Sequence, residues 1–368
     1  VALAAVGYLA WYPLRKATAG YFVNQAEQTS SQQQLHYYDR AQKILPEHPR
    51  VLMKQAQTVF AEVEQQEQNR TQEDEDLQQQ LTQQLGTALS LGQRAVKAEP
   101  RDLELPFLMA DMYLDTAQLV SAPEQAIDGA LNYLDRAAQI SPASPRPPYQ
   151  KAQAYFMKAR YHRQTEQQQK FEQATGKVEE HLNQALEKDP EFALARKELV
   201  RLAYFKKDYQ QTTQRGEEFL QDFPQQMEVR QWVAQSHYNL NQLKQARQQL
   251  DAILADNRND VQALTLAGKI AAHGEDYNKA VDYFERINAQ GEQNVSEILG
   301  QLSQEKNPFA QELEEEPDSS EQEQPEQVEV NSSVDLLRVR QKPDAEAKVL
   351  TKVEGGTQHE LIEQEKDW

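Results

Sequence analysis

The sequence predicts an all-α protein, a solenoid of stacked helical hairpins. Three observations support this fold class. The chain of 368 residues is rich in Gln, Ala, Glu and Leu, whose side chains lose little rotamer freedom in a helix. It contains only 13 Gly, too few for a Gly-rich nucleotide fold repeated over this length. Similar residues also recur every 34 positions in the second half, which indicates one repeated supersecondary unit.

Composition excludes several functions. The chain has 39 Lys and Arg against 58 Asp and Glu, a formal net charge of −19, which argues against a nucleic-acid partner because phosphate binding needs a basic surface. There is no Cys for a disulfide, a thiolate metal site or a nucleophile. No two His stand four residues apart, and no phosphate loop or nucleophile motif occurs. We therefore expect no catalytic, cofactor-binding or metal-binding residues; any catalytic domain would lie outside this chain.

The first 14 residues, VALAAVGYLAWYPL, carry no charge, and Arg15 and Lys16 follow at once. Trp11 and Tyr12 stand where an interfacial aromatic belt would lie. Because a membrane-spanning helix needs about 20 apolar residues, we interpret residues 1–15 as the end of a transmembrane helix that begins earlier. The alternative is a buried helix of a soluble domain. The first interpretation predicts a membrane-anchored protein. Arg15 and Lys16 would favour the cytoplasmic side for the residues that follow, whereas the C-terminal module considered below favours the outside, and we expect an extracytoplasmic soluble part.

The repeat is clearest in the second half of residues 16–305. Three sets of residues recur at a spacing of 34: Tyr209, Leu243 and Tyr277; Thr212, Ala246 and Ala280; and Leu199, Val233 and Ala267. Small side chains at recurring positions let two antiparallel helices approach closely. With Ala267-Gly268, Ala280 and Phe284 at these spacings, the pattern resembles the tetratricopeptide repeat. The resemblance implies a right-handed α-solenoid in which the first helix of each hairpin faces a concave groove.

The first half contains the same unit with longer helices. Ala precedes Pro by five residues four times, at Ala41, Ala95, Ala137 and Ala185. Because Pro shortly after a helix stops it, each pair predicts the end of a second helix. First helices are expected at about 16–27, 50–66, 102–120 and 148–163. This gives about seven hairpins and a capping helix at 294–304. Two polar inserts, 64–80 and 161–176, could be loops or solvated helix extensions.

The order of segments is more specific than the repeat. The run WYPLRKATAGYFVNQA is followed by a hairpin with a long polar insert, then by EPRDLELPFLMADMYLDTAQL, PPYQKAQAYFMKA and EKDPEFALARKELVRLAY. This order resembles the helical-repeat tail of bacterial O-antigen ligase/polymerase-like membrane proteins, over roughly residues 1–290. The glycosyl-transfer residues of that family lie in its membrane domain, so none can be assigned in this chain.

The last part of the chain changes character. Residues 309–327 contain eight acidic residues, two Pro and no Lys or Arg, so we expect 306–327 to form a disordered acidic linker. Apolar and polar residues then alternate over 328–368, which predicts a small β module. Leu337-Arg338-Val339-Arg340, then Pro343, Gly355-Gly356 and Trp368, resemble the start of a bacterial SH3-like (SH3b) domain. The resemblance implies a partial module that binds cell-wall peptides or protein partners.

The tetratricopeptide resemblance also places residues in the groove. With repeats starting at Ala193, Met227 and Val261, the predicted partner-binding residues are Lys197, Arg201, Tyr204, Gln231, Gln235, Tyr238, Thr265 and Lys269. Lys197, Arg201 and Lys269 would form a basic strip able to bind the carboxylates of a partner. The alternative is that they are ordinary solvated helix residues.

The sequence therefore predicts a protein–protein interaction scaffold, anchored to the membrane at a bacterial cell envelope, with protein or peptide ligands in its groove. The alternative function is that of an accessory C-terminal tail of an O-antigen ligase/polymerase-like membrane glycosyltransferase whose catalytic domain lies upstream. The sequence encoded before residue 1 would distinguish the two, because only the second needs many apolar helices there.

Overall fold

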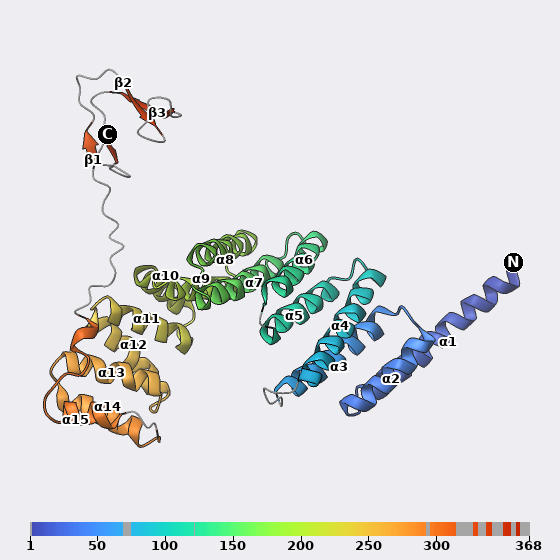
Figure 1. Cartoon of the computed structure of the whole chain (residues 1–368), viewed down its shortest axis with the longest axis horizontal. Coiled ribbons are helices and arrows are strands. Elements are labelled where there is room, and N and C mark those ends of the chain that lie inside the picture. Colours follow the sequence, from blue (N-terminus) through green and yellow to red (C-terminus); the bar gives the residue numbers. More distant parts are fainter. Residues whose placement is uncertain are drawn as a thin grey trace. The chain divides into compact units, whose positions relative to one another are not determined.

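The computed structural model describes residues 2–68, 75–120, 122–291 and 295–313, and four short strands between 327 and 360. Over the described helical part, the chain is a series of antiparallel hairpins followed by the short helix α15 (Ser296–Leu302) and a 3-10 turn, η1 (Ala310–Glu312) (Figure 1). Successive helices from α1 to α10, and from α12 to α15, pack against their neighbours. The all-α repeat fold predicted from the sequence is thus confirmed for this part.

The first helices of the hairpins are α1 (Ala2–Ala26), α3 (Pro49–Gln68), α5 (Glu104–Leu119), α7 (Arg146–Gln164), α9 (Ala193–Phe205), α11 (Met227–Asn239) and α13 (Val261–His273). The second helices are α2 (Ser31–Ile44), α4 (Glu75–Ala98), α6 (Glu124–Ile140), α8 (Gln168–Lys188), α10 (Tyr209–Asp222), α12 (Leu243–Asp256) and α14 (Tyr277–Asn288). The described parts of both polar inserts are mainly helical extensions of the hairpins.

The chain divides into two compact units, residues 1–233 and residues 234–368, with the boundary inside α11. Unit 1 contains α1 to α10 and the first half of α11. Unit 2 contains the rest of α11 and everything that follows it.

In unit 1, four second helices end in the same way. α2, α4, α6 and α8 each end two residues before a Pro, and the Ala five residues before that Pro is fully buried in every case. The N–H of the residue after each helix donates to the carbonyl of this Ala, over 2.9 to 3.2 Å. The recurring Ala–Pro pair therefore marks a point of close helix packing and the end of the helix together.

The later hairpins turn through a left-handed residue. Lys207, Asn241 and Glu275, spaced by 34, have φ of 62°, 55° and 57°. In each turn the next residue's N–H donates back to a carbonyl near the end of the first helix, as from Asp276 to Ala271 at 2.9 Å. This backbone bond closes the helix end, although none of the three residues is Gly.

Small residues form the hairpin contact in unit 2. Ala267 and Ala280 are fully buried. A Cβ built on Gly268 would lie 2.6 Å from the ring of Phe284, closer than real Cβ contacts. Helices α13 and α14 can approach as they do only because position 268 has no side chain. The capping helix α15 then covers the hairpin with Leu302, which is 1% exposed.

The N-terminal helix corrects one expectation. In the described part of the chain, no helix combines the length and the apolar character that a bilayer crossing requires. Helix α1 continues through Arg15 and Lys16, and its last turns pack Ala19, Val23 and Ala26 against α2. The predicted localisation, a membrane-anchored protein with an extracytoplasmic soluble part, is therefore wrong. The uncharged stretch that suggested it is the first part of a longer helix that carries charges.

Beyond the helices, β1 (Gln327–Glu329) pairs with β4 (Gln358–Glu360), and β2 (Leu336–Arg340) pairs with β3 (Val349–Glu354), both antiparallel. The remaining residues of the predicted SH3b-like module, and residues 314–326 of the predicted linker, lie outside the described residues. Residues 306–313 differ from the expected linker, because they fold onto unit 2 and bury Phe309 to 7% exposure.

Candidate functional site

Two adjoining cavities lie along the first helices of unit 1. The first, of about 520 Å³, is lined by Asp111, Leu114, Asp115 and Gln118 of α5, by Gln153, Phe156, Met157 and Arg160 of α7, and by Arg201 of α9. The second, of about 530 Å³, is lined by Phe156, Arg160, Arg163, Arg201, Tyr204, Phe205, Lys207, Tyr209, Glu228 and Trp232. Because Phe156, Arg160 and Arg201 line both, we treat the two cavities as one groove, the α5–α11 groove.

Aromatic side chains line the second cavity. The rings of Phe156 and Phe205 have centroids 4.8 Å apart. Tyr204 and Trp232, from α9 and α11, are stacked with centroids 6.2 Å apart and an angle of 20° between the rings. Burial raises the pKa of the Tyr204 hydroxyl, so this group stays neutral. The cavity thus offers flat apolar surfaces to a ligand side chain.

Guanidinium groups lie over these rings. The Cζ atom of Arg201 is 4.2 Å from the Phe156 centroid, and that of Arg163 is 4.9 Å from the Phe205 centroid. Arg163 also donates from Nη1 to the carbonyl of Phe205 at 3.1 Å. Among the residues that the structure describes, exposed Arg160 has no hydrogen-bond or ion-pair partner. The cavity therefore combines held cations with one that is available to a ligand.

Two predicted cations of this groove already have acidic partners. Lys197 Nζ is 2.5 Å from Glu228 Oε2, and the ammonium group lies 6.0 Å from the Trp232 ring. Arg201 Nη1 is 3.0 Å from Glu198 Oε2. Burial raises the pKa of the Glu198 carboxyl group, and the neighbouring Arg201 guanidinium offsets part of this rise. The two cations are fixed in place, and part of their charge is compensated within the chain.

The other end of the groove is acidic. Asp111 and Asp115 line the first cavity on α5, and burial raises the pKa of both carboxyl groups. Asp111 accepts a long bond from Gln150 Nε2 at 3.4 Å. The groove is therefore negatively charged at α5 and positively charged at α7 and α9. An extended ligand would meet opposite charges at the two ends of the groove, which favours one orientation of the ligand.

The other predicted residues fall into different settings. Gln231 is half-buried in unit 1. In unit 2, Gln235 donates to Asn239 at 3.1 Å, and Thr265 donates to the carbonyl of Val261 in its own helix at 2.7 Å. Tyr238 and Lys269 both contact Glu312. The predicted basic strip of Lys197, Arg201 and Lys269 is thus divided between two units, and each of its cations has a carboxylate partner.

Sequence reasoning missed Phe156, Arg160, Arg163 and Trp232. The first three lie on α7, which begins at Arg146, whereas α9 begins at Ala193, 193 − 146 = 47 residues later. A register of 34 extended backwards from the second half cannot reach the correct positions on α7. Trp232 was adjacent to predicted Gln231. The run PPYQKAQAYFMKARYHR, with aromatic and basic residues at helical spacing, was the available signal.

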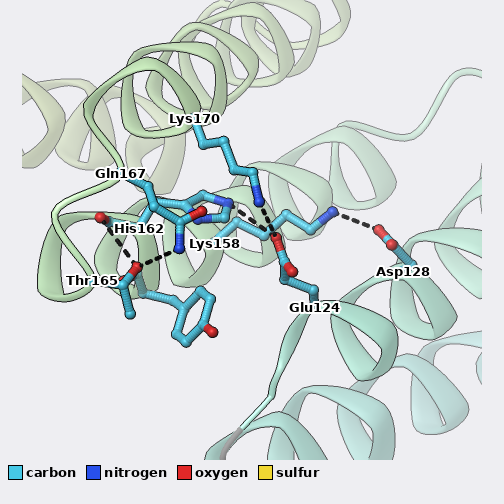
Figure 2. Close-up of polar contacts among 8 residues, drawn as sticks. Glu124, Asp128, Lys158, His162, Thr165, Gln167 and Lys170 are labelled. Atoms are coloured by element: carbon cyan, nitrogen blue, oxygen red, sulfur yellow. Dashed lines mark hydrogen bonds and ion pairs between the residues drawn. The ribbon is translucent and has the colours of Figure 1, made fainter.

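A second cluster of charges lies between α6, α7 and α8 (Figure 2). It borders a cavity of about 590 Å³. Lys158 contacts Asp128 at 2.6 Å, while His162 and Lys170 each lie 3.5 Å from Glu124. Asp128 and Glu124 therefore already compensate the charges of the two lysines, and the cluster joins three helices of one unit. In the described part of the chain, no group of three or more acidic or His residues is arranged to hold a metal ion.

The comparisons agree with this architecture. A family model described as tetratricopeptide repeat matches residues 203–270. No curated protein matches the sequence significantly. The match shows tetratricopeptide repeats over these residues, which lie within the series of helical hairpins.

Three solved structures are among those that match the chain. A tetratricopeptide-repeat protein from Parabacteroides merdae is 12% identical, with a TM-score of 0.47, over 78% of this chain and 98% of that chain. PilF from Pseudomonas aeruginosa is 15% identical, with a TM-score of 0.44, over 68% of this chain and 99% of that chain. YrrB, described as having an unusual peptide-binding site, is 17% identical, with a TM-score of 0.37, over 55% of this chain and 93% of that chain. The comparisons show neither the O-antigen ligase resemblance nor the SH3b resemblance.

Proposed function

We propose that this protein is a protein–protein interaction scaffold whose α5–α11 groove binds an acidic peptide segment of a partner. The observation that carries the proposal is the second cavity, where Arg160, Arg163 and Arg201 stand beside the Phe156–Phe205 and Tyr204–Trp232 pairs. An aromatic ligand side chain would stack on these rings, and a neighbouring carboxylate would accept hydrogen bonds from the guanidinium groups.

Charge supports the choice of ligand. The whole chain carries a net charge of −19, so it repels acidic partners in general. Glu228 is the single acidic residue among the ten that line the second cavity, and it is already bound to Lys197. A local basic, aromatic cavity in an acidic protein selects an acidic segment at this place and disfavours it elsewhere.

The first cavity adds the orientation of the ligand. A segment with its acidic and aromatic residues at Arg160 and Trp232 would extend towards Asp111 and Asp115 of α5. A Lys or Arg at that end of the ligand would meet these carboxylates, and a Glu there would be repelled. We therefore propose a ligand that is acidic and aromatic at one end and basic at the other.

The experiment uses three fluorescent peptides and the full chain, with binding followed by fluorescence anisotropy. One peptide has an acidic–aromatic end and a basic end, the second has its charges exchanged, and the third has the same composition in scrambled order. We expect the first to bind most tightly, and added salt to weaken it, because the charges are exposed. Equal binding of all three would contradict the proposal.

Variants localise the site. Arg160→Glu with Arg163→Glu should abolish binding of the first peptide, because both cations become repulsive. Arg101→Glu is the matched control, since Arg101 is an exposed Arg of the same unit that lines neither cavity. If Arg101→Glu weakens binding as much as the double variant, the groove is not the binding site and only the net charge matters.

Two finer expectations stay predictions. The SH3b-like module of residues 328–368 is expected to bind cell-wall peptides or protein partners. The role of an accessory tail beside an O-antigen ligase/polymerase-like glycosyltransferase stays the alternative function, and the sequence encoded upstream tests it.

A further inference from the structure

The segment after the capping helix α15 turns back onto unit 2. The N–H of Lys306 donates to the carbonyl of Gln301 at 3.1 Å, which closes α15. Asn307 Oδ1 then accepts from the N–H of Phe309 at 2.9 Å, and the N–H of Glu312 donates to the carbonyl of Phe309 at 3.0 Å. Residues 307–312, here called the returning segment, therefore form two consecutive turns.

The carboxylate of the returning segment is bound from two helices. Lys269 Nζ, on α13, donates to both oxygens of Glu312 at 2.7 and 2.8 Å. Tyr238 Oη, on α11, donates to Glu312 Oε2 at 2.9 Å. Charge-assisted hydrogen bonds of this kind are about twice as strong as neutral ones. The surface of the hairpins thus recognises one carboxylate specifically.

The aromatic residue of the same segment is also held. Phe309 stacks on Phe284 of α14, with centroids 5.6 Å apart and 22° between the rings. Lys269 Nζ lies 5.2 Å from the Phe309 centroid. A single lysine therefore contacts both the aromatic ring and the carboxylate, which fixes their spacing at three residues.

A neutral imidazole links the two ends of the segment. His273 Nε2 lies 2.9 Å from Tyr238 Oη, and its Nδ1 lies 3.3 Å from Asn307 Nδ2. Because Tyr238 gives its hydrogen to Glu312, its oxygen accepts from Nε2–H, and Nδ1 is free to accept from the Asn307 amide. An unbroken series of hydrogen bonds then runs from Asn307 to Glu312, and such networks fix geometry.

We propose that Tyr238, Lys269, His273 and Phe284 form a peptide-binding site for segments of the pattern Asn-x-Phe-x-x-Glu, and that residues 307–312 are its resident internal ligand. The apolar end of the last hairpin is already covered by Leu302 of α15, which is 1% exposed. The returning segment adds hydrogen bonds from Glu312 and Asn307 to the hairpin surface, and covering an apolar helix face does not require such bonds. This site belongs to unit 2 and is separate from the groove proposed above.

The internal ligand controls access to this site. A tethered segment has an effective concentration in the millimolar range, so an outside peptide must compete with it. Glu312 is 38% exposed and Lys269 is 26% exposed, so the ion pair is open to water and can be exchanged. A partner that carries the same pattern would displace the returning segment.

The test uses the full chain and a fluorescent peptide of residues 304–313, with binding followed by anisotropy. We expect weak binding to the wild type. Glu312→Lys should release the internal ligand and raise the affinity for the peptide about tenfold or more, because it removes charged hydrogen bonds and adds repulsion from Lys269. Lys269→Glu in that background should restore the internal ion pair with reversed charges and exclude the peptide again.

Glu305→Lys is the matched control, because Glu305 is exposed, lies just before the returning segment and undergoes the same change of charge. It should bind the peptide as weakly as the wild type. Phe309→Leu is a milder second variant, which keeps apolar burial and should raise peptide affinity less than Glu312→Lys does. The proposal is overturned if Glu312→Lys, with helicity unchanged, binds the peptide no better than Glu305→Lys, or if the reversed double variant binds it as well as the single one.

Discussion

Arg201 of α9 lies over the ring of Phe156 of α7, with its Cζ atom 4.2 Å from the ring centroid, and so joins two successive hairpins. The same guanidinium contacts Glu198 at 3.0 Å. A side chain held on one face by a ring and at one edge by a carboxylate has few other positions available. The cation that the groove presents at this point is therefore pre-organised, which reduces the entropy lost when a ligand binds.

Arg201→Lys tests this pre-organisation without a change of charge. Lysine has no planar guanidinium to place over the Phe156 ring while it contacts Glu198. We expect the affinity for the acidic–aromatic peptide to fall by about 0.5–2 kcal/mol, the range of cation–π contacts. Anisotropy titrations would measure this. Unchanged affinity would show that only the charge at position 201 matters.

A second prediction concerns the close approach of α13 and α14. Gly268→Ala places a methyl group 2.6 Å from the Phe284 ring, so the helices must separate or the ring must move. Extra volume in a packed core costs about 1–3 kcal/mol. Urea unfolding should show a loss of this size.

Gly176→Ala, in α8, provides the control for this substitution. Its new Cβ would have nothing within 4 Å. Ala is favoured over Gly inside a helix by about 0.5–1 kcal/mol, so this variant should be more stable than the wild type. The opposite signs separate helix propensity from packing, and equal signs would contradict the packing at Gly268.

A third prediction concerns the turn between α13 and α14. The sequence places Gly274 next to Glu275, but the left-handed conformation belongs to Glu275, with φ of 57°, whereas Gly274 has φ of −86°. The glycine thus stands one residue before the position that would benefit from it. Glu275→Gly should stabilise the protein by a few tenths to about 1 kcal/mol, because Gly adopts this conformation without a Cβ penalty.

Gly274→Ala completes this test. Its Cβ would lie 3.6 Å from the carbonyl oxygens of Ala271 and Ile270, which is ordinary contact. The variant should gain about 0.4–1 kcal/mol by restricting the unfolded chain. Thermal melting of the two single variants and the double variant would measure both effects. A loss of stability in either single variant would mean that the turn differs from the one described.

The repeat fold could be predicted from the sequence because its determinants are local and periodic. Ala246 and Ala280 stand 34 residues apart because each hairpin packs on the next in the same way, and both are fully buried. The Ala–Pro pairs marked helix ends because Pro cannot continue a helix.

The candidate sites could be predicted only in part, because they depend on contacts between distant residues. Lys197, Arg201 and Tyr204 all lie on α9, but Phe156 and Arg160 contribute from a helix whose longer hairpin breaks the register. Lys269 pairs with Glu312, which stands 312 − 269 = 43 residues later in the chain. Glu312 lies in a segment that composition alone assigned to a linker. Local charge counts cannot show that such an acidic residue has a specific partner.

The last prediction uses the buried imidazole of the α6–α8 cluster. His162 is 4% exposed, and burial lowers its pKa from 6.5; Glu124 of α6 opposes this shift, while Lys170 of α8 and Lys158 of α7 add to it. Above the unfolded pKa, both states hold a neutral imidazole. As the pH falls below about 6.5, the unfolded chain takes up a proton that the native state refuses.

The free energy of unfolding should therefore decrease through this window, by at most about 1.4 kcal/mol per pH unit for one group. His162→Gln cannot take up this proton, so its stability should depend less on pH between 7.5 and 5.5 than that of the wild type. Glu124→Gln removes the carboxylate that favours the charged imidazole, so its stability should continue to fall to lower pH. Urea unfolding at closely spaced pH values would measure all three curves. Parallel curves for the wild type and His162→Gln would show that this histidine takes up its proton equally in both states.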